Sequence, residues 1–383
     1  MCGMRAEPAV HSLPAVQIPV DQRRDRVASA RRTRLGTWLR VVVRVCITYR
    51  RAHGRLPALL RPRSFTEKIQ WRKLFELEPC FAVISDKLAA RDFVAQRIGA
   101  GRQAAVLWAG DDPDAIPFDR LVPPYVLKST HGAGQTIIVR DAAALDVAAV
   151  RSAARRGAAR EWLAYCFGSV NCEPAYIHVP RRLVVEQLLV DAHGAAPIER
   201  RVFVFDGRAT IIQTTVIGAN GALRTVAFHS REWERLRIIL ASVPDEVPPP
   251  RPPLLAEIID LAERLGAGLS HCRVDIYDCG DTLTVGEVTL YSWSGMTPFR
   301  DPAQDLAMGA HWKIRHPALR ALRAVAFGRW EIPYRRTGPL SGQDIHAAVS
   351  FNTLPVMFIS TRSGPHQSGA HGNEPDQGTR NAE

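Results

Sequence analysis

The spacing of apolar residues along the chain predicts both helices and strands. Residues 62–77 combine helical apolar spacing with Ser64 near the start and Glu67 three positions later, the arrangement of a capping box. A second helix over 86–99 is expected to end at Gly99, since glycine commonly terminates helices. Further helices are predicted over residues 35–51, 141–168, 254–266 and 301–311.

Runs rich in β-branched and aromatic residues predict strands between these helices. Residues 199–216 are expected to form a hairpin, because the dipeptide Asp206-Gly207 is a strong signal for a tight turn. Residues 273–290 show the same pattern around a turn at 279–281. Shorter strands are predicted over residues 125–128, 136–139 and 182–189.

The two ends of the chain lack any periodic apolar pattern. Residues 1–34 are polar and rich in arginine, and residues 340–383 are rich in Gly, Ser, Asn, Gln and His. Both segments are expected to be disordered, because they cannot bury enough apolar surface to offset the entropy of folding. The longest candidate for a membrane span, 38–49, is too short and contains Arg40 and Arg44.

Composition adds little to this outline. Hydrophobic residues make up 46% and charged residues 23% of the 383 residues, as in ordinary soluble proteins. The 7 cysteines show no metal-site spacing, and no secretory signal is visible. These features favour reduced thiols in a cytoplasmic protein.

The formal net charge of +12 is more unusual. Nucleic acid, an anionic membrane surface or phosphate-bearing substrates would each suit it. The arginines lack interleaved aromatic residues, and no helix-turn-helix or zinc module is visible, which argues against nucleic acid. The pattern of residues 35–51 predicts a basic amphipathic helix. Such a helix could lie against the inner face of a membrane or pack against its own domain, and both interpretations are open.

The hairpin over 273–290 carries two carboxylates in unusual positions. Asp275 and Glu287 lie in apolar runs, one on each strand, where an unpaired charge is costly to bury. With the turn centred on residue 280, Glu287 is expected opposite residue 273, which places 273, 275 and 287 on one face. This arrangement suits Mg²⁺, and an ordinary hairpin with solvent-facing carboxylates is the alternative.

A glycine-bearing loop joins the strands predicted over 125–128 and 136–139. Lys128 ends the first strand, and residues 129–135 follow as Ser-Thr-His-Gly-Ala-Gly-Gln. Such a loop lets backbone N–H groups approach phosphate oxygens, and the lysine adds a positive charge. The sequence matches neither a Walker A motif nor a dinucleotide-binding fingerprint, so an ordinary turn is the alternative.

Six motifs stand in order along the chain. They are PRSFTEKIQW at 62–71, DKLAAR at 86–91, YVLKSTHGAG at 125–134, RLVVEQ at 182–187, RVDIY at 273–277 and GEVTLY at 286–291. In order and spacing they resemble the ATP-grasp superfamily, and more closely its TupA-like branch of polysaccharide and teichuronopeptide biosynthesis proteins. The resemblance covers roughly two thirds of the chain, from about residue 48 to residue 312.

The resemblance implies an α+β fold, the ATP-grasp fold, in which two subdomains clamp ATP. It divides the chain into a basic arm at 1–34, a helical region at 35–120, a small subdomain with the glycine loop at 121–186, a large subdomain with the metal hairpin at 187–339 and a tail at 340–383.

Carried onto this sequence, the resemblance also implies a role for each matching residue. Lys87 and Lys128 would contact the nucleotide phosphates, and Arg273 would face the transferred phosphoryl group. The loop residues that would close over the triphosphate include Ser129, His131, Gly132 and Gly134. The residues at the adenine edge would be Glu186, Gln187 and Leu188. Mg²⁺ would be held by Asp275, Glu287 and, where the superfamily usually has Asn, Thr289.

The implied activity is that of a carboxylate–amine ligase that uses ATP and Mg²⁺. Such an enzyme moves the γ-phosphoryl group of ATP to a carboxylate, and an amine then attacks the acyl phosphate. The TupA-like branch implies a uronic acid or amino acid carboxylate in a cell-surface polymer precursor. The aromatic residues of 291–295 would either stack on a sugar or belong to the core. A catalytically silent nucleotide-binding scaffold is the alternative, and the oligomeric state is left open.

Overall fold

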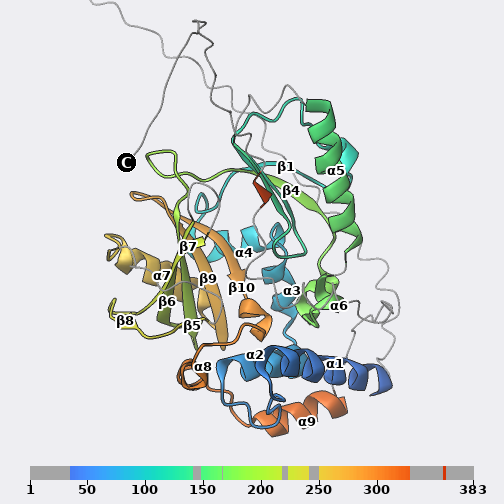
Figure 1. The fold of residues 1–383 in the computed structure, drawn as a ribbon, viewed down its shortest axis with the longest axis vertical. Helices are drawn as coiled ribbons and strands as arrows, with labels where there is room; N and C mark the ends of the chain where they lie inside the picture. The colour runs from blue at the N-terminus through green and yellow to red at the C-terminus, as the bar shows by residue number, and fades with distance from the viewer. Residues whose placement is uncertain are drawn as a thin grey trace, which may run out of the picture.

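The computed structural model describes residues 35–140, 148–165, 167–217, 223–240, 250–327 and 357–358. The arm at 1–34 and all of the tail at 340–383 except 357–358 lie outside the described residues. Figure 1 shows a small sheet at one end of the molecule, a large sheet beside and below it, and a group of helices at the opposite end. The mixture of helices with largely antiparallel sheets confirms the α+β prediction.

The small sheet contains the glycine hairpin. Its strands follow the order β1-β4-β2-β3-β11, and β11 alone runs parallel to its neighbour. The strands are β1 (Val106–Gly110), β2 (Tyr125–Ser129), β3 (Thr136–Val139), β4 (Leu183–Gln187) and β11 (Met357–Phe358). Helix α5 (Ala148–Ala164) covers one face, where Ala159 and Trp162 pack with the sheet's apolar residues.

The large sheet carries the second hairpin. Its order is β10-β9-β5-β6-β7-β8, and every pair within it is antiparallel. The strands are β5 (Ile198–Phe205), β6 (Arg208–Ile217), β7 (Leu223–Ser230), β8 (Arg235–Leu236), β9 (His271–Asp278) and β10 (Leu283–Thr289). The predicted Asp206-Gly207 turn is confirmed, and both residues have positive φ values, 48° and 77°.

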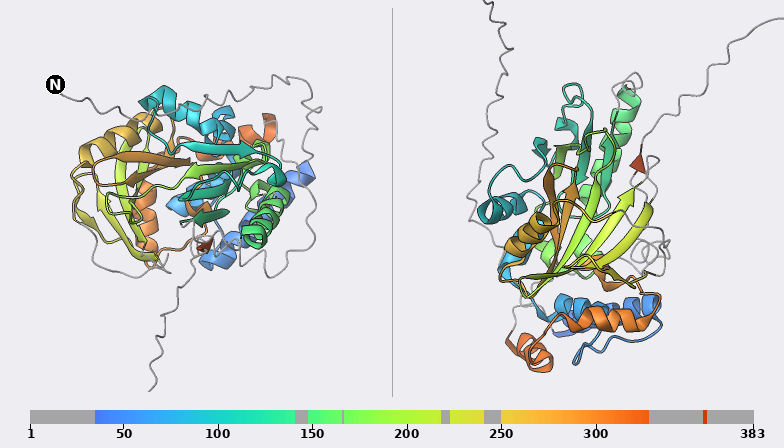
Figure 2. Two further views of the ribbon diagram at one scale, coloured as in Figure 1. Left: turned by 90° about the horizontal axis from the view of Figure 1, so that it is seen from above. Right: turned by 90° about the vertical axis from the view of Figure 1, so that its left-hand side faces the viewer.

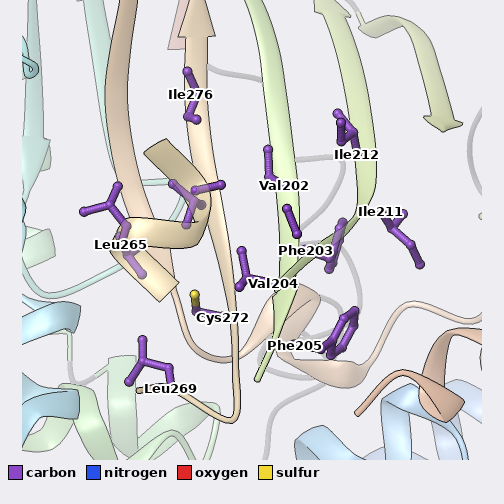
Figure 3. Close-up of a cluster of buried hydrophobic side chains, with 14 of the residues drawn as sticks. Val202, Phe203, Val204, Phe205, Ile211, Ile212, Leu265, Leu269, Cys272 and Ile276 are labelled. Atoms are coloured by element: carbon purple, nitrogen blue, oxygen red, sulfur yellow. The ribbon is translucent and has the colours of Figure 1, made fainter. Parts of the chain in front are cut away.

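The main hydrophobic core fills the space beside the large sheet (Figure 3). Side chains alternate across each strand, so Val202, Val204 and Ile276 turn to one face. Helix α7 (Leu255–Gly266) covers this face, and a side chain at Gly266 would collide with Val204. The opposite face holds Phe203 and the charged residues of the candidate site.

The remaining helices build the end of the molecule that lies away from the small sheet, together with the segment between the two sheets (Figures 1 and 2). They are α1 (Leu35–His53), α2 (Phe65–Phe75), α3 (Pro79–Ser85), α4 (Ala89–Ile98), α6 (Phe167–Val170), α8 (Pro302–Ala310) and α9 (Pro317–Phe327). Short 3₁₀ turns occupy Pro113–Ala115, Pro174–His178 and Ser292–Gly295.

Helix α2 is buried on every side, which its sequence did not suggest. The predicted capping box is confirmed, with the Ser64 side chain accepting from the Glu67 N–H. The buried cations bond to carbonyl groups of distant segments. Lys68 Nζ donates to the Gly309 and Trp312 oxygens at 2.7 and 2.6 Å, while Arg72 Nη1 donates to His271 and Leu290 oxygens at 2.8 and 3.0 Å. The last two bonds secure the lower ends of β9 and β10.

Helix α1 packs on the same layer. Val41, Val45 and Tyr49 are buried, and the two valines join Trp71 and Leu74 of α2 in one cluster. This face therefore fits the interpretation that the basic helix packs against its own domain. The opposite face of α1 is exposed.

Three elements differ from the sequence predictions. Strand β1 lies in the region 35–120 that was expected to be helical, because its residues add to the open edge of β4. Helix α4 begins at Ala89 instead of Asp86, since the Asp86 side chain accepts from the Leu88 N–H and forms a turn. Strand β11 lies in the tail expected to be disordered and pairs with β3.

We expect Gly309→Ala to lower the free energy of unfolding by about 1–3 kcal/mol. An added Cβ would lie 2.7 Å from the Phe65 backbone nitrogen and 2.8 Å from the Ser64 carbonyl carbon, so α8 would be pushed from α2. Gly157→Ala in α5 is the matched control, because no atom lies near its added Cβ and alanine favours helix. Urea unfolding of both variants measures the difference; equal stability would contradict this packing.

Candidate functional site

The β9–β10 hairpin places Glu287 directly opposite Asp275 and Thr289 opposite Arg273. The prediction that Glu287 pairs with residue 273 was therefore wrong by two positions. The loop between the strands contains four residues instead of three, and a bulge at Gly286 adds one residue to β10. The side chains of residues 273, 275 and 287 nevertheless meet on one face of the sheet.

Arg273 holds this cluster together. Its Nε and Nη2 donate to the two oxygens of Asp275 at 2.6 Å each. Nη2 also lies 3.4 Å from Glu287 Oε1 and 3.3 Å from Thr289 Oγ1, and Thr289 donates to Glu287 at 2.9 Å. The guanidinium thus balances two carboxylates that would otherwise repel each other.

Burial and nearby charges act on the two carboxylates in opposite senses. Burial raises the pKa of the Asp275 carboxyl, and the Arg273 guanidinium opposes that rise. Burial would also raise the pKa of Glu287, but the charges of Lys87 and Arg273 outweigh it and hold that pKa at about 2. Glu287 is therefore ionised near neutral pH, as a cation ligand must be.

The donor atoms of this cluster suit Mg²⁺. Asp275, Glu287 and Thr289 offer two carboxylates and a hydroxyl, and Mg²⁺ prefers oxygen ligands. Across the part of the chain that the structure describes, no group of three or more His, Cys, Asp or Glu residues is placed to hold a metal ion. A cation here would thus have two protein carboxylates and take its other ligands from water or phosphate, as Mg²⁺ commonly does.

A second charged cluster lies on the small sheet. Lys128 Nζ donates to Glu186 Oε2 at 2.8 Å, and Arg91 Nη1 lies 3.4 Å from Glu186 Oε1. The residues come from β2, β4 and α4, and Glu186 is largely buried. Glu186 therefore keeps two cations beside the end of the glycine hairpin.

The glycine loop is held by the turn before α4, by helix α5 and by a bond within the hairpin. Lys87 Nζ donates to the Gly132 carbonyl, and the Lys87 N–H donates to the Thr130 carbonyl at 3.3 Å. His131 Nε2 bonds to the Trp162 carbonyl of α5 at 3.0 Å, and Ser129 donates to Gln135. His131 thus anchors the loop to α5. Gly134 has a φ of +74°, which favours glycine at this turn.

The two residues after Glu186 have their backbone N–H groups occupied. The Gln187 N–H donates to Ala105 O at 2.9 Å, and the Leu188 N–H donates to Pro124 O at 3.4 Å. The bond from Leu188 is the longer one, so it is the weaker hydrogen bond of the two. The Gln187 side chain is exposed at the end of β4.

The two charged clusters approach each other at Lys87 and Glu287. Both residues line one cavity, together with Tyr176 and Gly286. Burial lowers the pKa of Lys87, and the nearby Glu287 carboxylate opposes this fall. Lys87 lies in the turn before α4 and is half-buried, so it does not face open solvent. It links the loop of the small sheet to the hairpin of the large one.

The segment 291–295 belongs to the core. Tyr291 and Trp293 are buried, and the Trp293 ring lies 5.2 Å from Phe203 and 6.1 Å from Phe65, centroid to centroid. Of the two interpretations of these aromatics, the sugar-stacking wall is therefore excluded for Trp293. Its φ of +51° is stabilised by bonds from Gln70 and Lys73 to the Ser294 carbonyl.

Sequence reasoning missed Arg201 as a site residue. Its Nε lies 3.9 Å from Asp275 Oδ2, and its Nη2 lies 2.7 Å from Glu199 Oε2. Arg201 pairs with Asp275 across β5 and β9, so both side chains share one face of the large sheet. The alternation of β5 contained the signal, since Arg201 shares a face with Phe203 and points away from the buried Val202 and Val204.

Several solved structures are similar to this chain. D-alanine–D-alanine ligase from Bacillus anthracis complexed with ATP has a TM-score of 0.37 and 15% identity, covering 63% of this chain and 67% of that chain. The ATP-grasp ligase PsnB with its minimal precursor has a TM-score of 0.32 and 18% identity, covering 64% and 62%. The ADP complex of N5-carboxyaminoimidazole ribonucleotide synthetase has a TM-score of 0.33 and 13% identity, covering 54% and 45%. The chain thus spans less than half of that synthetase.

The comparison with curated protein sequences gave no match. A family model described as TupA-like ATPgrasp matches residues 67–313, which contain the glycine loop and both strands of the β9–β10 hairpin. The motif order, the two sheets and this match agree. The chain belongs to the TupA-like ATP-grasp family, and its fold is the ATP-grasp fold.

Proposed function

We propose that this protein is an ATP-dependent ligase that activates a carboxylate as an acyl phosphate and joins it to an amine. The observation that carries the proposal is the approach of the two charged clusters at Lys87 and Glu287. Lys87, which also bonds to the glycine loop at Gly132, thus faces Glu287 of the hairpin across one cavity. Phosphoryl transfer needs charge neutralisation and positioning more than covalent help, and these groups supply both.

Each cluster has a distinct task in this proposal. Lys128 and Lys87 bind the phosphates of ATP, and the backbone of Ser129 to Gly134 closes over them. Lys128 would exchange its bond with Glu186 for one with a phosphate, while Arg91 remains to balance the carboxylate. Glu186, Gln187 and Leu188 lie at the adenine edge, where the weakly held Leu188 N–H is the best placed to be released.

Asp275, Glu287 and Thr289 would hold Mg²⁺, which neutralises the phosphate oxygens during transfer. Arg273 faces the transferred group and, by its two bonds to Asp275, keeps the carboxylate in place. The Arg201 guanidinium lies between the carboxylates of Asp275 and Glu199, on the same face of the large sheet.

The family suggests the class of substrate. We propose a uronic acid or amino acid carboxylate in a cell-surface polysaccharide or teichuronopeptide-like precursor, made in the cytoplasm. The alternative of a silent scaffold is disfavoured because the chain has both lysines, Lys87 and Lys128, and both carboxylates, Asp275 and Glu287, and because Lys87 and Glu287 line one cavity. We also propose that the chain divides near residues 34, 120, 186 and 339, with β1 and β11 completing the small subdomain.

Phosphate release tests this function. The full chain is incubated with ATP, Mg²⁺ and an amine, against a panel of uronic acids and amino acids. We expect phosphate and ADP to form in amounts that depend on one carboxylate class. ATP binding without carboxylate-dependent phosphate release for any member would support the scaffold instead.

A further inference from the structure

The outer faces of α1 and α9 form a surface that the proposed site does not use. On α1, Leu39, Val43 and Ile47 stand at positions i, i+4 and i+8 and are exposed, on the side opposite the buried Val41 and Val45. These three residues form one apolar stripe along the helix. A stripe of this kind normally packs against something.

Further exposed apolar residues lie on α9 and in the loop after α1, at the same end of the molecule. Leu319 and Leu322 of α9 and Leu56 and Leu60 of the loop are exposed, and with the α1 residues the exposed fractions run from 43% to 64%. Helices α1 and α9 lie at the same end of the molecule (Figures 1 and 2), and Val45 and Ala321 join one buried cluster with residues of α2. Their outer faces therefore point away from α2 and from the two sheets.

The charge of this surface has a single sign. Residues 35–64 and 312–327 contain no Asp or Glu. The exposed arginines and lysines of these segments are Arg40, Arg50, Arg51, Arg55, Arg61, Arg63, Lys313, Arg315 and Arg323. Apolar side chains are thus set within an acid-free rim of cations.

We propose that this surface binds an anionic lipid bilayer, with the exposed leucines, valine and isoleucine in the interface and the cations on the headgroups. Stable peripheral binding needs two signals, and this surface offers both apolar insertion and charge. No helix in the described part of the chain is long and apolar enough to cross a membrane, so the contact would be peripheral.

Two other occupants fit the surface less well. A second copy of the chain, docked through the same face, would set arginines against arginines. A nucleic acid would attract the cations but would gain nothing from the apolar side chains between them. A bilayer with acidic headgroups satisfies both components at once.

Vesicle sedimentation of the full chain tests the proposal. We expect binding to phosphatidylcholine vesicles that contain phosphatidylglycerol, little binding to phosphatidylcholine alone, and weakening by salt. The double variant Val43→Glu/Ile47→Glu should reduce partitioning at least roughly tenfold, as should Arg50→Glu/Arg51→Glu. Val122→Glu is the matched control, because Val122 is 79% exposed in the loop before β2 and should leave binding unchanged.

Thermal melting confirms that each variant is folded, and Arg50→Gln/Arg51→Gln provides a milder change of charge. Equal binding of wild type to neutral and anionic vesicles, or unchanged binding by the Val43→Glu/Ile47→Glu variant, would overturn the proposal. A concentration-dependent dimer that this variant abolishes would assign the surface to a second copy. Binding of duplex DNA without any vesicle binding would assign the charge to nucleic acid.

Discussion

Asp275→Asn and Glu287→Gln are each expected to lower ATP turnover by at least about 100-fold. Loss of residues that merely orient metal ligands already costs roughly 10–100-fold, and a direct ligand should cost more. The amide keeps the size of each side chain but removes the charge that a cation requires. The measurement is steady-state release of phosphate at saturating ATP and Mg²⁺.

Asp275→Asn and Glu287→Gln should also lose the rise in melting temperature that Mg²⁺ and ATP cause in the wild type. Mg²⁺ with ATP is expected to raise the melting temperature of the wild type, because a ligand that binds only the folded state stabilises it. Asp281→Asn is the matched control, since Asp281 lies exposed in the turn of the same hairpin and should keep both turnover and the thermal shift. If both carboxamide variants turn over ATP at the wild-type rate, this hairpin does not hold the metal ion.

Lys128→Ala is expected to weaken ATP binding by roughly 10–100-fold while the fold survives. A hydrogen bond to a charged group contributes about 1.5–3 kcal/mol, and about 1.4 kcal/mol corresponds to tenfold in affinity. The fold should tolerate the change, because Glu186 keeps Arg91 as a partner at 3.4 Å. Calorimetric titration with ATP and Mg²⁺ gives the affinity directly.

Lys313→Ala serves as the matched lysine control. Lys313 is exposed near α9, far along the chain from the glycine loop, and its removal should leave the affinity for ATP unchanged. A melting curve for each variant separates loss of binding from loss of structure. If folded Lys128→Ala binds ATP as the wild type does, the lysine has no part in nucleotide binding.

Sequence patterns correctly predicted the structural features that depend on neighbouring residues alone. The capping box of Ser64 and Glu67 and the Asp206-Gly207 turn depend on neighbours within a few residues, and both are present in the structure. These signals survive folding because tertiary contacts do not compete with them. Asp275 and Glu287 also share the predicted face, but only because the four-residue loop and the bulge at Gly286 each shift β10 by one residue.

The features that were missed depend on distant partners. Gly286 forms the bulge that changed the hairpin register, and an added Cβ would lie 2.7 Å from the Tyr277 ring, a contact that the hairpin sequence alone does not reveal. The full burial of α2 depends on carbonyl groups such as Gly309 and Trp312, far along the chain. The sequence left open whether Trp293 faces a sugar, because the Phe203 ring that packs against it lies 90 residues earlier in the chain.

The most direct test of the whole account is a calorimetric titration of the full chain with ATP, with and without Mg²⁺. The facing clusters predict saturable binding of one ATP per chain, with a Kd between about 1 μM and 1 mM, the common range for enzyme substrates. Binding should require Mg²⁺ for full affinity and be weakened in Glu287→Gln. No measurable binding of ATP by folded protein in the presence of Mg²⁺ would contradict the account at its centre.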